Sequence, residues 1–206
     1  MIKSTSKDQD KILLNILSLI GEERFTLDPC YGKGNFYKNV PEPLYKIDIN
    51  GQNAPEGDSR KLPFPDNSIK SIIFDPPFLA TTRPSLKKDT GNIINKQFSV
   101  YPSEKELFEF YCDSLLEFYR LITQKGWLII KCQDKVSSGK QYFSHIYIHN
   151  MALSLGFYPK DLFIYIKNNR IVADWQKNQQ HARKFHSYFW IFQKIKPKVT
   201  GIIGYN

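Results

Sequence analysis

The sequence is poor in the features that mark disulfide-bonded, zinc-binding and membrane-spanning proteins. It has three cysteines in 206 residues, Cys30, Cys112 and Cys132, and none of them has Cys-x-x-Cys spacing. This argues against a disulfide framework and a zinc site, so we expect no bound metal. No apolar run approaches the roughly 20 residues that a membrane-spanning helix needs, and the first residues lack the apolar core of a signal peptide. We therefore expect a protein of the reducing cytoplasm that does not enter a membrane.

Acidic residues are also scarce relative to basic ones. The chain has 29 lysines and arginines against 20 aspartates and glutamates, which gives a formal net charge of +9. A basic surface attracts polyanions and steers their approach. The charge alone therefore favours nucleic acid as the partner without establishing it.

Short apolar segments alternate with amphipathic ones along the chain. We expect helices at residues 8–20, 104–122 and 141–155, and strands at residues 25–28, 44–48, 71–74, 127–130, 161–167 and 186–193. Strands that alternate with helices predict an α/β fold with a parallel sheet covered on both faces. The chain length fits one domain, residues 1–206. Residues 79–102 and 168–184 are polar and basic, and we expect them to form mobile loops that face the substrate.

A glycine-bearing turn, Asp28-Pro29-Cys30-Tyr31-Gly32-Lys33-Gly34, directly follows the first expected strand. Gly32 and Gly34 lack a Cβ, so the backbone can turn sharply and approach a ligand closely. Ligands of open α/β sheets bind beyond the carboxyl ends of the strands. The third glycine of the dinucleotide fingerprint is replaced by Tyr37, which disfavours a nicotinamide cofactor. The alternative is an ordinary tight turn with surface acids.

Acidic residues after the next segments fit a nucleoside cofactor. Asp48 ends the second expected strand, where a carboxylate can accept hydrogen bonds from both ribose hydroxyls. Asp58, which precedes Ser59, could bind an adenine amino group. An acid at position 28 is favourable beside a cationic sulfonium cofactor, which has no phosphate. The candidate cofactor-binding residues are Asp28, Pro29, Cys30, Gly32, Gly34, Asp48, Asp58 and Ser59.

The tetrapeptide Asp75-Pro76-Pro77-Phe78 follows the third expected strand. An exocyclic base amine is a poor nucleophile because its lone pair is delocalised into the ring. The Asp75 carboxylate and the Pro76 carbonyl can accept its two hydrogens, which localises the lone pair and stabilises the growing positive charge. Two prolines hold these acceptors still, and Phe78 can stack on an extruded base for about 1–3 kcal/mol. These four residues are the catalytic candidates; the alternative is a rigid corner with a buried phenylalanine.

In this order, the two motifs resemble those of the amino-methyltransferases of nucleic acids. The signature of that family is (D/N/S)-P-P-(Y/F/W) at the end of the fourth strand, and the resemblance spans residues 25–131. It implies a Rossmann-like domain with a seven-stranded, mostly parallel sheet whose last strand is antiparallel. It also implies S-adenosylmethionine as the cofactor and methyl transfer to DNA, to adenine ahead of cytosine. The family's usual target-recognition domain is missing, so the two basic loops, a partner or a second copy of the chain would recognise the target.

Basic residues interleaved with aromatic ones in the two expected loops suit a phosphate backbone and unstacked bases. The candidate substrate-binding residues are Arg83, Lys87, Lys88, Trp175 and Arg183. Lys131, which follows the strand at 127–130, could be structural or could face the substrate. The alternatives to a DNA enzyme are an RNA guanine or adenine amino-methyltransferase, a catalytically silent binding module, and a methyltransferase for protein glutamine or a small-molecule amine. The net charge favours nucleic acid over protein glutamine or a small-molecule amine as the substrate.

Overall fold

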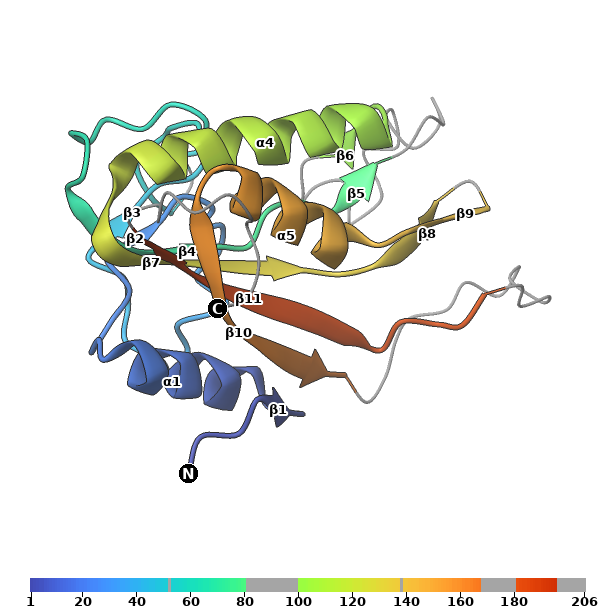
Figure 1. The fold of residues 1–206 in the computed structure, drawn as a ribbon, viewed down its shortest axis with the longest axis horizontal. Helices are drawn as coiled ribbons and strands as arrows, with labels where there is room; N and C mark the ends of the chain where they lie inside the picture. The colour runs from blue at the N-terminus through green and yellow to red at the C-terminus, as the bar shows by residue number, and fades with distance from the viewer. Residues whose placement is uncertain (52, 81–99, 138, 168–180, 196–206) are drawn as a thin grey trace, which may run out of the picture.

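The computed structural model describes residues 1–51, 53–80, 100–137, 139–167 and 181–195. Within these residues, seven strands form one sheet in the order β1-β10-β11-β7-β4-β2-β3 (Figure 1). Its strands are β1 (Thr5–Ser6), β2 (Leu27–Asp28), β3 (Tyr45–Lys46), β4 (Ile69–Phe74), β7 (Ile122–Cys132), β10 (Phe157–Ile166) and β11 (His186–Lys194). Strand β11 is antiparallel to both β7 and β10, and the other pairings are parallel. The predicted seven-stranded sheet with an antiparallel last strand is confirmed.

Helices cover the two faces of the sheet. Helices α4 (Glu104–Leu121) and α5 (Ser144–Ser154) lie on one face, and α1 (Gln9–Ile20) lies on the other (Figure 1). Successive strand residues point to opposite faces, so the core divides into two clusters. Ile72 and Leu128 pack in the cluster under α4, whereas their neighbours Ile73 and Ile129 pack with α1. The central strands β4 and β7 are therefore apolar on both faces, as their sequences predict.

Helix α1 begins and ends where its capping residues stand. The Asp8 carboxylate accepts the backbone N–H groups of Asp10 and Lys11, at 3.0 and 3.3 Å. Gly21 closes the helix with a φ of 72°, and its N–H donates to the Leu17 carbonyl. Both ends match the sequence expectation because capping depends on local residue types.

The prediction for the segment before α5 was wrong at its start. Residues 141 and 142 belong to strand β9 (Lys140–Tyr142), which pairs with β8 (Lys135–Ser137) in an antiparallel hairpin. Gly139, at φ 74°, occupies the turn. Helix α5 begins only at Ser144, where the side chain of the distant Asp134 accepts the N–H of His145 at 3.3 Å.

Other boundaries also differ from the sequence expectation. Strand β10 begins at Phe157 because a register shift between Pro159 and Asp161 lets the ladder pass the proline, which has no N–H. Strand β1 pairs with β10 at the sheet edge and was not expected. No helix among the described residues is long and apolar enough to cross a membrane.

The two expected loops lie mostly outside the described residues. Strands β5 (Leu79–Ala80) and β6 (Val100–Tyr101), at the ends of the first loop, pair in parallel with each other. Four of the candidate substrate-binding residues fall outside the described parts: Arg83, Lys87, Lys88 and Trp175.

Candidate active site

The glycine turn after β2 requires glycine at two positions. Gly32 and Gly34 have φ values of 57° and 67°, in the left-handed region that favours glycine. A Cβ on Gly34 would also lie 2.6 Å from the hydroxyl oxygen of Tyr31. Tyr31 itself stacks on Tyr37, with ring centroids 5.5 Å apart. The turn therefore has a packed side chain on one side and backbone that a ligand can approach.

Asp28 lies buried at the end of β2, with a hydrogen-bond donor on each oxygen. Its Oδ1 accepts the Cys30 N–H at 2.9 Å, and its Oδ2 accepts the Tyr37 hydroxyl at 2.6 Å. Burial raises the pKa of Asp28 to about 7, and the charges of Asp75 and Asp48 add to the rise, although the two hydrogen bonds oppose it. Tyr37 occupies the position of the missing third glycine, so the residue that breaks the dinucleotide fingerprint here anchors the loop carboxylate.

Asp48 ties the glycine turn to the end of β3. Its Oδ2 accepts the Gly32 N–H at 2.8 Å, and its Oδ1 accepts the Asn50 N–H at 2.9 Å. The backbone N–H of Tyr31 donates to the Ile47 carbonyl beside it, at 3.1 Å. Asp48 therefore shapes the loop. The ribose contact expected from the sequence stays a prediction.

Asp58 and Ser59 are both engaged by other side chains. The Arg60 guanidinium contacts both Asp58 oxygens, with Nη2 at 2.7 Å from Oδ2, and its hydrogen bonds lower the Asp58 pKa. The Ser59 hydroxyl is buried and lies 3.1 Å from the Ser114 hydroxyl of α4. The adenine contact expected of Asp58 stays a prediction, and Arg60 is its main protein partner.

The Asp75-Pro76-Pro77-Phe78 corner follows directly from β4 and is pinned on two sides. The Tyr111 hydroxyl of α4 donates to the Pro77 carbonyl at 2.8 Å. The Lys135 ammonium donates to the Phe78 carbonyl at 2.6 Å and also pairs with Glu104 at 2.9 Å. No side chain of the described residues donates to the Pro76 carbonyl. The corner is thus held through the Pro77 and Phe78 carbonyls.

The Asp75 side chain makes an ion pair with Lys131, the next-to-last residue of β7. The Lys131 Nζ lies 2.9 Å from Asp75 Oδ2 and 4.8 Å from the centroid of the Phe36 ring. Phe36 comes from the segment directly after the glycine turn. The Asp75 corner and the segment that follows the glycine turn are therefore linked through one ammonium group.

Four carboxylates come close to the glycine turn. Burial raises the pKa of the Cys30 thiol well above its usual range, and the charges of Asp28, Asp75, Asp48 and Asp58 raise it further. Like charges at one place repel unless a cation compensates them. Asp58 already pairs with Arg60 and Asp75 with Lys131, whereas no cation among the described residues pairs with Asp28 or Asp48. These two carboxylates are therefore the ones that a cationic ligand at the turn could compensate. Among the described residues, no group of three or more metal-ligating side chains is arranged to hold a metal ion.

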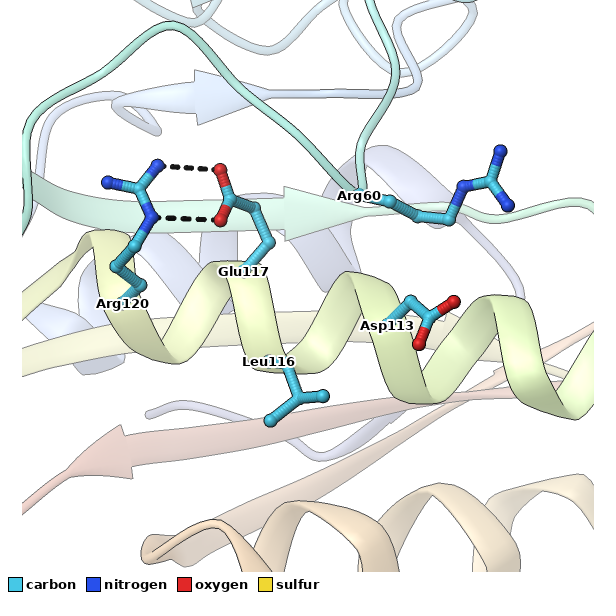
Figure 2. Close-up of a pocket in the computed structure, with 5 residues that line it drawn as sticks. All are labelled: Arg60, Asp113, Leu116, Glu117 and Arg120. Atoms are coloured by element: carbon cyan, nitrogen blue, oxygen red, sulfur yellow. Dashed lines mark hydrogen bonds and ion pairs between the residues drawn. The ribbon is translucent and has the colours of Figure 1, made fainter.

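A separate hollow of about 490 Å³ lies along α4 (Figure 2). Its lining residues are Arg60, Asp113, Leu116, Glu117 and Arg120. Two of its charged residues pair with each other, since Arg120 bonds to both oxygens of Glu117, while Arg60 pairs with Asp58 outside the lining. Neither the glycine turn nor the Asp75 corner lines it, so the hollow is not the candidate active site.

The structure brings the two sequence motifs together at the carboxyl ends of the neighbouring parallel strands β2 and β4. It leaves Arg183 half-buried shortly before β11, away from any described interaction with the corner. Sequence reasoning missed the supporting residues Tyr37, Arg60, Tyr111 and Lys135 and left Lys131 open. For Lys131 a signal existed, because it follows the expected strand at 127–130 just as Asp75 follows the expected strand at 71–74. For the others the partner lies in a distant segment, with no local pattern to reveal it.

No protein-family model matches the sequence, and no curated protein sequence matches it. Solved structures do match the fold. An S-adenosylmethionine-dependent methyltransferase from Methanosarcina mazei is 11% identical with a TM-score of 0.50, and the match covers 87% of this chain and 97% of that one. A chain from the complex of a methyltransferase activator with a candidate methyltransferase of Haloferax volcanii is 11% identical with a TM-score of 0.55, covering 91% and 90%.

A candidate DNA modification methylase from Thermus thermophilus, solved with S-adenosyl-L-methionine bound, is 20% identical with a TM-score of 0.48. The match covers 71% of this chain but 56% of that one, so this chain spans little more than half of its length. S-adenosylmethionine, the cofactor predicted from the sequence, is also the cofactor of the Methanosarcina mazei protein. The chain has the fold of S-adenosylmethionine-dependent methyltransferases.

Proposed function

We propose that this chain binds S-adenosylmethionine at the glycine turn and methylates the exocyclic amine of a base in DNA, adenine ahead of cytosine. One observation carries the proposal. The Asp75 corner, which has the residues to activate a conjugated amine, lies at the same sheet edge as the glycine turn, close enough for the Asp75 charge to raise the pKa of Asp28 and Cys30.

The residues around the turn fit the proposed cofactor. Bound there, the sulfonium would supply an activated methyl group. Asp28 and Asp48 provide compensating negative charge, and Gly32 and Gly34 have no Cβ that would keep a ligand from the backbone. Asp48 holds that backbone in place through the Gly32 N–H. The chain thus contributes negative charge and a fixed backbone conformation, rather than a set of backbone N–H groups arranged to bind a phosphate.

The Asp75 corner would act on the base. One Asp75 oxygen and the Pro76 carbonyl accept the two amine hydrogens, which turns the lone pair toward the methyl group. The pinned Pro77 and Phe78 carbonyls keep the corner rigid. In-line placement of nitrogen, methyl carbon and sulfur would supply much of the remaining acceleration.

The choice of nucleic acid rests on charge, and the choice of DNA on motif order. The net charge of +9 favours a polyanion over a small-molecule amine or a protein side chain. The cofactor loop precedes the catalytic corner, which is the order that the sequence resemblance associates with DNA amino-methyltransferases. We propose that a partner or a second copy of the chain helps to recognise the target.

Substitution of Asp75 tests the proposal. We expect Asp75→Ala to abolish methyl transfer from labelled S-adenosylmethionine to DNA while cofactor affinity, measured by calorimetry, stays the same. Asp113→Ala, which removes an exposed aspartate on α4, is the matched control and should retain activity. Loss of cofactor affinity together with activity in Asp75→Ala would mean that the two sites are misassigned. Transfer to RNA alone would refute the choice of DNA.

A further inference from the structure

We propose that Lys131 is a positioning residue that fixes the Asp75 carboxylate for the amine, an inference that rests on the proposed function. Lys131 occupies Asp75 Oδ2 at 2.9 Å, and no described side chain occupies Oδ1. One oxygen is therefore anchored to the protein, and the other is left to accept a hydrogen from the substrate.

Strand register brings the two residues together. Phe74 of β4 pairs with Ile130 of β7 in a parallel ladder. The residues that follow these two, Asp75 and Lys131, therefore lie side by side at the carboxyl ends of these strands. Alternation of side chains places both on the face of Ile73 and Ile129, which pack toward α1. The ion pair thus follows from the central, most buried part of the sheet and does not depend on a loop conformation.

Two aromatic rings restrict the Lys131 ammonium. It lies 4.8 Å from the Phe36 ring centroid and 5.9 Å from that of Phe189, its partner across the β7–β11 ladder. A cation is attracted to the faces of such rings, and the attraction grows as water is excluded. The Lys131 side chain is 16% exposed and that of Asp75 is 29% exposed. The two rings therefore restrict the position of the Lys131 ammonium independently of its ion pair with Asp75.

The surrounding charges explain why Asp75 needs this support. Asp28 lies near enough for the two carboxylates to interact unfavourably. Without a cation on Oδ2, Asp75 would be free to rotate away from Asp28 and from the position that the amine requires. Because Phe36 follows the glycine turn, Lys131 also ties the orientation of Asp75 to the cofactor loop.

A positioning role and a purely structural role predict different kinetics. We expect Lys131→Met to lower kcat on the order of 100-fold, the loss produced by about 1 Å of misplacement of a reacting group. The KM for DNA and the cofactor Kd should change less than about twofold, because uniform binding is preserved. Lys131→Arg keeps the cation and should restore most of kcat. Lys11→Met makes the same change in an exposed ion pair on α1 and is the control.

The decisive experiment is a double-mutant cycle of kcat with Asp75→Asn. The asparagine retains an oxygen acceptor but removes the charge that Lys131 holds. If Lys131 acts through Asp75, then Lys131→Met should cause no further loss in the Asp75→Asn protein. If the kcat losses of the two single variants multiply in the double variant, the positioning role is overturned. A kcat for Lys131→Met within about twofold of the wild-type value would overturn it as well. A wild-type protein that transfers no methyl group to nucleic acid would instead refute the proposed function, and the inference would fall with it.

Discussion

The ionisation of Asp28 should control the affinity of the protein for a cationic cofactor. Burial raises its pKa to about 7, so the carboxylate is mostly ionised at pH 8 and mostly protonated at pH 6. Binding of a sulfonium favours the ionised form. We therefore expect the Kd for S-adenosylmethionine to rise about tenfold from pH 8 to pH 6, because the ionised fraction of a group with a pKa near 7 falls by about that factor.

Calorimetry at several pH values measures this directly. S-adenosylhomocysteine, which lacks the sulfonium charge, should show a much weaker dependence on pH. Asp28→Asn keeps an oxygen for the Cys30 N–H and should flatten the dependence for S-adenosylmethionine. The pH dependence of folding stability has the opposite sign to that of cofactor binding. Because the Asp28 pKa is raised in the folded protein, its contribution to stability is present at low pH and is lost as pH rises toward 7. Asp28→Asn, which cannot ionise, should remove this loss of stability. An equal pH dependence for the two ligands would refute the reasoning.

Three substitutions test the supporting structure. Gly34→Ala should lower the free energy of unfolding by about 1–2 kcal/mol in chemical denaturation, because its φ is positive and its Cβ would meet Tyr31. Tyr111→Phe removes the hydrogen bond to the Pro77 carbonyl and should reduce kcat by about 2- to 10-fold in a steady-state assay; an unchanged kcat would show that the corner needs no such support. Lys194→Met should lower stability by about 2–3 kcal/mol, because this buried ammonium donates to three oxygens, while the cofactor Kd measured on the folded protein should not move.

The sequence predicts the centre of the fold better than its edges. Strands β4 and β7 are apolar on both faces, and helix α1 carries its own capping residues, so their positions follow from local pattern. Strand β1 has two residues and is fixed only by pairing with β10. The β8–β9 hairpin contains residues that also fit a helical pattern, and tertiary pairing decides between the two.

The candidate site shows the same division. The glycine turn and the Asp75 corner can be recognised because their chemistry is concentrated in short segments. The Asp48 oxygens accept the N–H groups of Gly32 and Asn50. These contacts depend on how the turn folds back toward β3, and the spacing of the residues along the sequence does not predict them. Lys131 is intermediate: counting register between two parallel strands would have placed it beside Asp75.

The central claim is that the Asp75 corner activates an exocyclic amine. Its most direct test is to incubate the protein with labelled S-adenosylmethionine and with DNA or RNA, digest each polymer to nucleosides, and identify the methylated atom by mass spectrometry. The account predicts a methyl group on the amino nitrogen of deoxyadenosine, or on that of deoxycytidine, and its loss in Asp75→Ala. A methyl group on a ring carbon or a ring nitrogen would contradict the account.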